Sequence, residues 1–311
     1  GTSIVFITHK LREVKAVADR ITVIRLGKVV GDAKPEASTA ELASMMVGRE
    51  VELTVEKGAA KPGEPVFAVK NLTLLDPVGR LLLDDISFEI HAGEILAVAG
   101  VQGNGQTELT EAIVGLRDHV RGSIKLHGEE LARADVRHVL EAGVGYVPED
   151  RKKDGLVAEF TVAENLMLDR SFSGPFAKGL SVDFAHRDEF ADSAIGEFDI
   201  RTQAATSPVI RLSGGNQQKV VLARELSRDL KLLVAAQPTR GVDVGSIEFI
   251  HERIVEVRDS GVPVLIISTE LDEVLALADR IAVMYHGRII DIVPPDTARE
   301  RLGQLMAGVA A

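Results

Sequence analysis

Residues 95–109 read ILAVAGVQGNGQTEL, a short apolar strand that runs into a glycine-rich loop and then into a polar helix start. Glycines allow successive backbone N–H groups to turn inward, and the helix that follows presents its positive N-terminal end to an anion. This order of elements predicts a cradle for phosphate groups. The glycines that would form it are Gly100, Gly103 and Gly105.

The residues after these glycines depart from the usual phosphate loop. That pattern continues with Lys and then Ser or Thr, so that an ammonium reaches the outer phosphates and a hydroxyl reaches Mg²⁺. Here the pair is Gln106 and Thr107. Because an amide lacks the point charge of Lys, the loop would hold a nucleotide but stabilise phosphoryl transfer poorly. A glycine turn that binds nothing has a similar pattern, so this motif alone does not decide the function.

The composition limits the class of protein. The chain has 311 residues, enough for one large domain or two smaller ones with a buried core. Its formal net charge is −11 and it has no basic stripe, which argues against nucleic acid as the main partner. It contains no Cys, which excludes disulfides and thiolate metal sites. Its apolar runs have the length of strands, far short of the roughly 20 residues that cross a bilayer.

The N-terminus is repeated near the other end of the chain. Residues 1–30, GTSIVFITHKLREVKAVADRITVIRLGKVV, match residues 261–290, GVPVLIISTELDEVLALADRIAVMYHGRII, so that residue 1 aligns with residue 261 at a constant offset of 260. Each copy indicates a buried strand, a polar turn, a helix ending in Ala-Asp-Arg, and a hairpin that turns at Gly27 or Gly287. The match is too long to arise by chance.

The first copy lacks the strands and helices that precede the second copy, so we expect the chain to start inside a domain. Residues 1–48 would be the tail of a first module, residues 49–64 an exposed linker rich in Gly, Pro and charge, and residues 65–311 a second module. The apolar strands expected at residues 4–7 and 21–24 would then lack their sheet. They would pack elsewhere, pair with another chain, or stay disordered.

Within residues 65–311 the pattern indicates both kinds of sheet. Alternating segments at residues 66–74 and 81–90 predict antiparallel strands that lead to the phosphate loop. Beyond the loop, strands alternate with helices, as in the strand at 232–236 and the helix at 246–258. This alternation predicts a mostly parallel sheet covered on both faces.

A second motif, RLSGGNQQK at residues 211–219, precedes an amphipathic stretch. Its Ser and glycines stand just before a helix, where a hydroxyl and bare amides can meet an anion. Alone it would be an ordinary helix N-cap. Its position changes that interpretation, because it lies between the phosphate loop and a strand that ends in AAQPTRGVDVG, residues 235–245. A further strand ends at Thr269, where the first copy carries His9.

This ordered set resembles the nucleotide-binding subunits of ABC transporters, and the resemblance covers essentially the whole chain. It is most similar to the duplicated ATPases of bacterial importers for simple sugars and nucleosides. Four segments are most similar to the nucleoside-type members: GVQGNGQTEL, VPEDRKKDGLV, LSGGNQQK and AAQPTRGVDVG. The resemblance implies an α/β P-loop NTPase fold with a mostly parallel core sheet, an antiparallel β subdomain and a helical subdomain at about residues 150–215.

In this family two modules enclose ATP head to tail, with the phosphate loop of one facing the signature motif of the other. The resemblance implies that ATP would be bound by Gly100, Gln102, Gly103, Asn104, Gly105, Gln106, Thr107 and Glu108. Thr107 would also be a ligand of Mg²⁺, and Asp243 would lie in the loop where the modules meet. The signature motif would be Leu212, Ser213, Gly214, Gly215 and Gln217.

The second module departs from the family pattern at nearly every catalytic place. Gln106 replaces the Lys of the phosphate loop. Ala236 stands where an Asp helps to hold Mg²⁺, and Gln237 stands where a Glu polarises the attacking water. Thr269 replaces the switch His. Glu149 stands where a Gln usually touches the metal and signals to the membrane subunits.

These departures imply two unequal sites. We expect the intact signature motif to complete a working site whose phosphate loop lies in the first module, with His9 as the catalytic switch residue. The second site would bind ATP without rapid turnover. The full-length protein is therefore expected to be an ATPase, whereas this chain alone would hydrolyse little or no ATP.

The resemblance also implies partners and a location. These are integral-membrane permease subunits, a first nucleotide-binding domain in the same full-length chain, an external substrate-binding protein that acts indirectly, and the cytoplasmic face of the bacterial plasma membrane, where the protein is peripheral. Two alternatives stay open: a soluble ATPase of the same fold that works on DNA or ribosomes, which the acidic charge disfavours, and a regulatory module that binds nucleotide without hydrolysis. Substrate choice belongs to the permease and the external protein.

Overall fold

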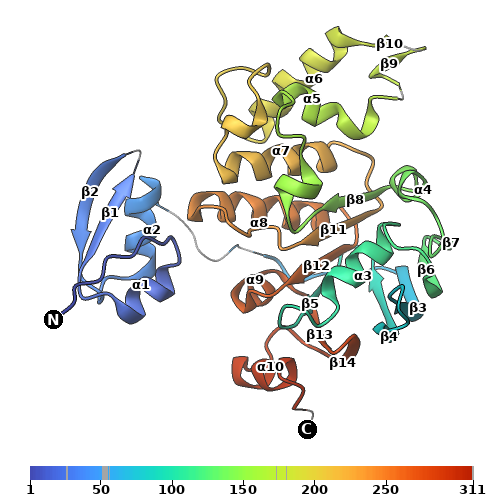
Figure 1. The fold of residues 1–311 in the computed structure, drawn as a ribbon, viewed down its shortest axis with the longest axis horizontal. Coiled ribbons are helices and arrows are strands. Elements are labelled where there is room, and N and C mark those ends of the chain that lie inside the picture. Colours follow the sequence, from blue (N-terminus) through green and yellow to red (C-terminus); the bar gives the residue numbers. More distant parts are fainter. Residues whose placement is uncertain (26, 51–54, 56, 173, 180, 310–311) are drawn as a thin grey trace.

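The computed structural model describes residues 1–25, 27–50, 55, 57–172, 174–179 and 181–309. Its main element is a six-stranded sheet with the order β14-β13-β5-β12-β11-β8 (Figure 1). Every neighbouring pair is parallel except β13 with β14, so the predicted mostly parallel core sheet is confirmed. Its strands are β5 (Ile95–Ala99), β8 (Val144–Val147), β11 (Leu232–Ala236), β12 (Val264–Ser268), β13 (Arg280–Tyr285) and β14 (Arg288–Val293).

Strand β5 is buried on both faces because its side chains alternate between two cores. Ile95, Ala97 and Ala99 pack with the helices of one face, and Leu96 and Val98 pack with the elements of the other. The helices of the first face are α7 (Gly214–Leu226), α8 (Val244–Asp259) and α9 (Leu271–Leu277), and those of the second are α3 (Gln106–Ile113) and α4 (Val136–Glu141).

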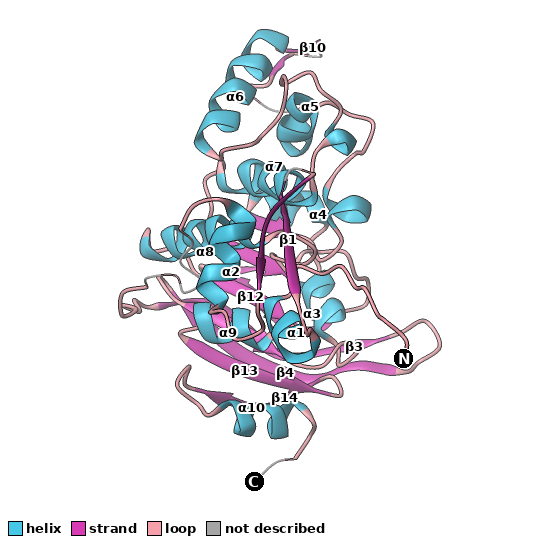
Figure 2. Ribbon diagram, turned by 90° about the vertical axis from the view of Figure 1, so that its left-hand side faces the viewer, coloured by secondary structure: helices cyan, strands magenta, loops and turns pink. Residues whose placement is uncertain are grey.

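A second sheet completes the core on the side of α3. It is antiparallel, as predicted, and has the order β4-β3-β6-β7. Figure 2 shows its strands β3 and β4 lying below the helices, near β13. Its strands are β3 (Pro65–Leu75), β4 (Leu81–His91), β6 (Arg121–Leu126) and β7 (Glu129–Glu130).

The helical part extends from the carboxyl end of β8 and lies at the top of Figure 1. The charged run after β8 forms a π-helical turn, Arg151–Gly155, in which the Asp150 carboxylate accepts the N–H groups of Lys152 and Lys153. The other elements are α5 (Val162–Met167), the 3₁₀ turns Leu168–Arg170 and Val209–Arg211, α6 (Phe184–Glu197), and the short strands β9 (Ala177–Lys178) and β10 (Ser181–Val182). None of the helices within the described ranges has the length and apolar character needed to span a bilayer.

The internal repeat is confirmed for the elements that follow the first strand. In the N-terminal unit, defined as residues 1–50, α1 (Leu11–Val17), β1 (Ile21–Arg25), β2 (Lys28–Ala33) and α2 (Thr39–Val47) follow in the order of α9, β13, β14 and α10 (Arg299–Met306). Both hairpins carry the same irregularity, between Val23 and Ile24 in one and between Val283 and Met284 in the other. The offset of 260 therefore describes backbone structure as well as sequence.

The strand predicted at residues 4–7 is wrong. Its counterpart β12 pairs with β5 and β11, whereas residues 4–7 are exposed and lie outside every strand of the described chain. A strand needs a neighbouring strand to accept its backbone hydrogen bonds, and no strand within the described ranges pairs with these residues. The second predicted strand does form, because β1 pairs with β2 and buries Ile21 and Val23 against α2.

The predicted linker, residues 49–64, is described only in part, because residues 51–54 and 56 lie outside the described ranges. The end of this segment contacts residues 65–309, called the larger body below, through hydrogen bonds and an ion pair of Lys57. The Lys57 Nζ donates to the carbonyls of Leu277 and Ala278 at 2.8 and 2.6 Å and to Asp279 Oδ1 at 2.9 Å. Burial lowers the pKa of Lys57. The hydrogen bond to Asp279 opposes this effect, because the carboxylate favours the charged ammonium.

The Asp279 carboxylate joins three parts of the chain. Besides Lys57, it accepts Arg258 Nη1 at 3.2 Å and the N–H of Ile95, the first residue of β5, at 2.9 Å. The Arg258 side chain is only 1% exposed. Removing the carboxylate would leave two cations close together with little water to solvate them.

We expect Asp279→Ala to lower the free energy of unfolding by about 3 kcal/mol, the usual cost of breaking a buried ion pair on one side. Urea unfolding followed by circular dichroism measures the change. Asp19→Ala is the matched control, because Asp19 is the repeat counterpart of Asp279, is exposed, and makes no ion pair with another described residue. That variant should change stability by no more than about 0.5 kcal/mol. Equal losses in the two variants would contradict this account.

Candidate nucleotide-binding site

The phosphate loop connects β5 to α3 as the sequence predicts. Gly105 caps α3 in the left-handed region at φ 106°, and no side chain caps the helix. The first-turn N–H groups of Gln106, Thr107 and Glu108 therefore have no acceptor within the described chain. Free amides at the positive end of a helix fit an anion such as a phosphate group.

The Gln106 side chain closes the loop on itself. It is buried, its Nε2 donates to the Val101 carbonyl at 3.1 Å, and its Oε1 accepts the N–H of Asn104 at 3.2 Å. Asn104 is also tied to the hairpin of β13 and β14, because its Oδ1 accepts the N–H of His286 at 3.0 Å. The amide therefore stiffens the loop and supplies no positive charge to a ligand.

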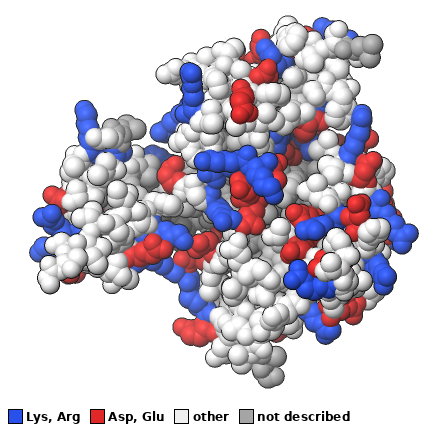
Figure 3. Space-filling model, in the orientation of Figure 1, with Lys and Arg blue, Asp and Glu red and all other residues white. Residues whose placement is uncertain are grey.

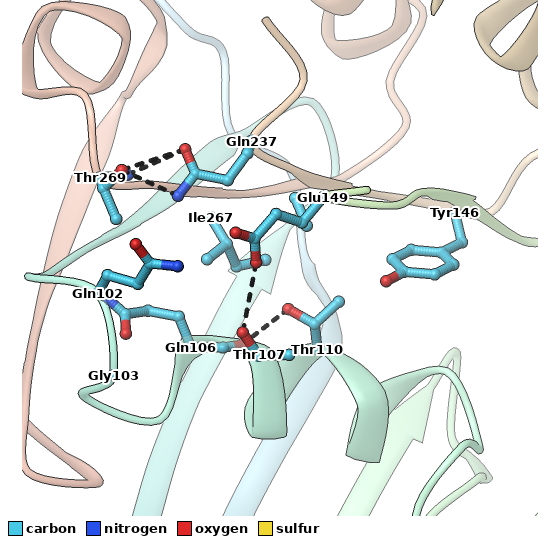
Figure 4. Close-up of a pocket in the computed structure, with 11 residues that line it drawn as sticks. Gln102, Gly103, Gln106, Thr107, Thr110, Tyr146, Glu149, Gln237, Ile267 and Thr269 are labelled. Atoms are coloured by element: carbon cyan, nitrogen blue, oxygen red, sulfur yellow. Dashed lines mark hydrogen bonds between the residues drawn. The ribbon is translucent and has the colours of Figure 1, made fainter. Parts of the chain in front are cut away.

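The opposite wall of the pocket comes from the carboxyl ends of β8, β11 and β12, which carry Glu149, Gln237 and Thr269 (Figure 4). Glu149 reaches down to α3, where its Oε2 accepts the Thr107 hydroxyl at 3.4 Å. Gln237 is turned to Thr269, and its Nε2 donates to the Thr269 hydroxyl at 3.1 Å. The other lining residues are Gln102, Gly103, Gln106, Thr110, Tyr146, Ala236 and Ile267.

The pocket between these walls has a volume of about 20 Å³, which is room for about one water molecule. Oxygen and amide groups line it next to the Tyr146 ring. Burial, and then the nearby carboxylates of Asp154, Glu111 and Glu149, raise the pKa of Tyr146 above its usual range, so its hydroxyl stays neutral. The space between the phosphate loop and the strand ends is therefore small.

Two of the strand ends carry residues that cannot take part in proton transfer. An amide cannot take a proton from water, so Gln237 is no general base, and its neighbour Ala236 has no polar group. Among the described residues, no three His, Cys, Asp or Glu side chains lie close enough to hold a metal ion. The Thr107 hydroxyl and the Glu149 carboxylate are two oxygens at this pocket that could contact Mg²⁺, with phosphate oxygens as further ligands.

The signature motif lies at the start of α7 and is not part of this pocket. Ser213 caps α7, with its Oγ accepting the N–H of Asn216 at 3.4 Å. Gly215 packs so closely on the start of α8 that a Cβ there would lie 2.7 Å from Asp243 Oδ2. The structure thus brings Asp243 beside the signature motif. Leu212, Gly214 and Gln217 complete the motif, and the Gln217 side chain is buried.

His9 is also outside the pocket. It precedes α1 in the N-terminal unit and is exposed, one residue before Lys10, which pairs with Glu270. Thr269, its repeat counterpart, lines the pocket. The predicted role of His9 in another site stays a prediction.

Two arginines at the edge of the site were not singled out by the sequence motifs. Arg240 forms an ion pair with Glu149, and Arg151 donates to the carbonyls of Arg240 and Gly241 at 2.7 and 3.1 Å. These contacts connect the π-helical turn with the loop after β11. Both residues lie inside quoted motifs, but only folding shows that the two motifs touch.

Comparison with known proteins agrees with this geometry. The family model described as ABC transporter matches residues 83–240, just over half of the chain. The chain belongs to this family. Its loop and sheet are those of an ABC ATPase domain, for which ATP is the nucleotide.

The relatives give a finer picture. The chain is 47% identical over 310 residues to the nucleoside import ATP-binding protein NupA of Lactococcus lactis subsp. cremoris (strain MG1363), which covers 99% of this chain and 61% of that protein. It is 44% identical over 315 residues to the glucose import ATP-binding protein TsgD13 of Haloferax volcanii, with 99% and 57% covered. The chain thus spans about 60% of the length of these curated relatives.

Solved structures share the fold. A nucleotide-free ATP-binding cassette from an ABC transporter superposes with a TM-score of 0.63 at 23% identity, covering 78% of this chain and 96% of that one. The predicted fold class is therefore confirmed.

We expect Gly100→Ala to weaken ATP binding by roughly tenfold or more, because the added methyl group would displace the loop that contacts the phosphates. Overpacking costs about 1 to 3 kcal/mol, and a loss of about 1.4 kcal/mol in binding free energy is tenfold in affinity. A Cβ at Gly100 would lie 2.5 Å from Gln106 Nε2 and 2.7 Å from the Met284 carbonyl, so the loop must shift. Titration calorimetry with ATP and Mg²⁺ measures the change. Gly196→Ala in α6 is the control, because its Cβ meets nothing within 4 Å. Unchanged affinity in Gly100→Ala would contradict the assigned cradle.

Proposed function

We propose that this chain is part of the ATP-binding, energy-coupling subunit of a bacterial importer, and that its own phosphate loop holds ATP with little hydrolysis. The observation that supports this most is the combination of free first-turn N–H groups on α3 with Gln237 and Thr269 in place of groups able to move a proton. The import names of the relatives support the transport assignment.

ATP phosphates would be held by the backbone of residues 100–108, the positions carried over from the family. Mg²⁺, when bound with the phosphates, would supply charge neutralisation. The Thr107 hydroxyl would contact the ion, and the Glu149 carboxylate is close enough to join it. Arg240 holds that carboxylate from the other side through an ion pair.

The proposed organisation has two modules. Residues 1–48 would be the tail of a first nucleotide-binding domain, residues 49–64 a linker, and residues 65–311 a second domain with its helical subdomain at about 150–215. The repeat supports this division, because the N-terminal unit has the same elements as the end of the second module. The signature motif from Leu212 to Gln217 would complete the site of the first module, with His9 as its switch residue.

The partners and the location are proposals of the same kind. Permease subunits in the membrane would receive the motion of the paired modules, an external protein would deliver substrate, and this subunit would lie on the cytoplasmic face of the membrane. The charged π-helical turn Arg151–Gly155 is the part we assign to the permease, because it is linked to the pocket through Arg240. Nucleosides are the proposed substrate class, with simple sugars as the alternative.

A regulatory module that binds nucleotide without hydrolysis is the second candidate, and the altered catalytic positions favour it for this chain in isolation. A soluble ATPase outside transport is the third. Its main support would be a basic surface for nucleic acid, whereas the net charge is −11.

We expect the purified chain to bind ATP in the presence of Mg²⁺ and to release phosphate no faster than a blank. Equilibrium dialysis measures binding, and a phosphate-release assay measures turnover. Thr107→Val is the informative variant, because it keeps the shape of the side chain and removes the hydroxyl, so that Mg²⁺ should no longer improve binding. Rapid phosphate release by the chain would overturn the assignment of a holding site, and the absence of binding would overturn the assignment of a cradle.

A second expectation concerns the signature motif in the full-length protein assembled with its permease. Ser213→Ala should reduce the rate of ATP hydrolysis much more than the loss of another helix cap does. Losing a cap lowers the free energy of unfolding by only about 1 kcal/mol. Asp183→Ala is the matched control, because Asp183 caps α6 in the same helical part by accepting the N–H of His186. Equal turnover in the two variants would contradict a role for Ser213 in the other module's site.

A further inference from the structure

The N-terminal unit contacts the larger body along one junction. Val244, at the start of α8, packs in the small core of the unit with Leu11 and Leu42. Arg49 Nη2 lies 2.6 Å from Glu248 on α8. Acidic and basic side chains lie side by side where the unit meets the body (Figure 3).

Two further ion pairs cross this junction between α1 and α9. Lys10 Nζ lies 3.2 Å from Glu270 Oε1, and Arg12 Nη2 lies 2.7 Å from Asp272 Oδ1. Lys10 and Glu270 are the N-cap residues of the two helices. Each pair joins a residue to its own counterpart at the offset of 260.

When two similar helices are related by a local two-fold axis that runs between them, residues near the axis contact the matching residues of the other helix. In a symmetric dimer of identical helices, such contacts would place like charges against each other. Here the two copies differ in sign, because the first copy is basic at both positions and the second copy is acidic at both. Attraction replaces repulsion at each contact.

We propose that the N-terminal ends of α1 and α9 form a charge-coded pairing surface, on which the basic repeat copy selects the acidic copy and rejects another copy like itself. The partner of each helix is thus the other repeat copy of this protein. The inference rests on the repeat and its ion pairs, and it goes beyond nucleotide binding.

Selection, and not stability, is the effect that these pairs can have. Each of the four side chains is at least half exposed, so each pair alone contributes little to stability. The difference between pairings is larger, because like pairing loses two attractions and gains two repulsions. Two neighbours share the surface: Arg299 also pairs with Asp272, and Glu13 lies 3.8 Å from Lys10.

The absence of natural Cys allows a direct test. The parent chain carries Lys10→Cys and Glu270→Cys, and a short bismaleimide reagent reports their proximity, because a direct disulfide requires Cα atoms within about 7 Å. The pair of Arg12 and Asp272 is then varied. We expect intrachain cross-linking at low salt to slow with Arg12→Gln and to slow about fivefold with Arg12→Asp, which turns attraction into repulsion.

Two controls separate charge pairing from other effects. In a chain that also carries Asp272→Asn, Arg12→Asp should no longer slow the reaction, since the opposing carboxylate is gone and Arg299 remains. Lys28→Asp makes the same charge change in β2 of the same unit and should have no effect. At about 1 M salt the differences should vanish, because the Debye length falls to about 3 Å.

A single-Cys series tests the rejection of like copies. The Lys10→Cys chain should form cross-linked dimers no faster than the Lys28→Cys chain. Faster dimers through position 10 would show that like helices pair, and equal intrachain rates for Arg12 and Arg12→Asp at low salt would show that charge does not guide the contact. Either result would overturn the inference. ATP binding, measured on the same chains, tests the proposed function separately, because these residues lie outside the phosphate loop.

Discussion

The rest of the structure depends on the burial of β5 between two parallel neighbours. Because β12 and β13 pair on its two sides and each face meets a separate core, the strand has no freedom to shift. Its carboxyl end therefore delivers the glycine loop to one place, beside the ends of β8, β11 and β12. The Asp279 carboxylate holds the other end of β5 and links it to Arg258 and Lys57. A rigid strand is what makes a short loop of glycines a defined site.

The altered residues of the site form one consistent set. The Gln106 side-chain amide hydrogen-bonds within the loop. Gln237 and Thr269 hydrogen-bond to each other, and Glu149 contacts both Thr107 and Arg240. The side chains of these four residues therefore have hydrogen-bond or ion-pair partners within the protein, whereas the first-turn N–H groups of α3 do not. Side chains that are hydrogen-bonded to one another can keep their positions between binding events.

Local patterns predicted much of the fold. The strands near residues 66–74 and 81–90, the parallel core and the helix after the phosphate loop were all found, because alternation and glycine placement are local properties. The strand expected at residues 4–7 was wrong for a physical reason: its apolar pattern equals that of β12, but a strand also requires a neighbouring strand. The charged run after β8 became a π-helical turn because Asp150 caps it, which charge pattern alone does not indicate.

The sequence by itself determined the repeat, the family motifs and the departures from them, since each of these is a property of residue identity and spacing. Tertiary structure alone decided which of these segments touch. It brought Arg151 to the loop after β11, attached Lys57 to Asp279, and placed Lys10 and Arg12 opposite their own repeat counterparts. These contacts join residues up to 260 positions apart, and only the packing of strands and helices sets the distance between such segments.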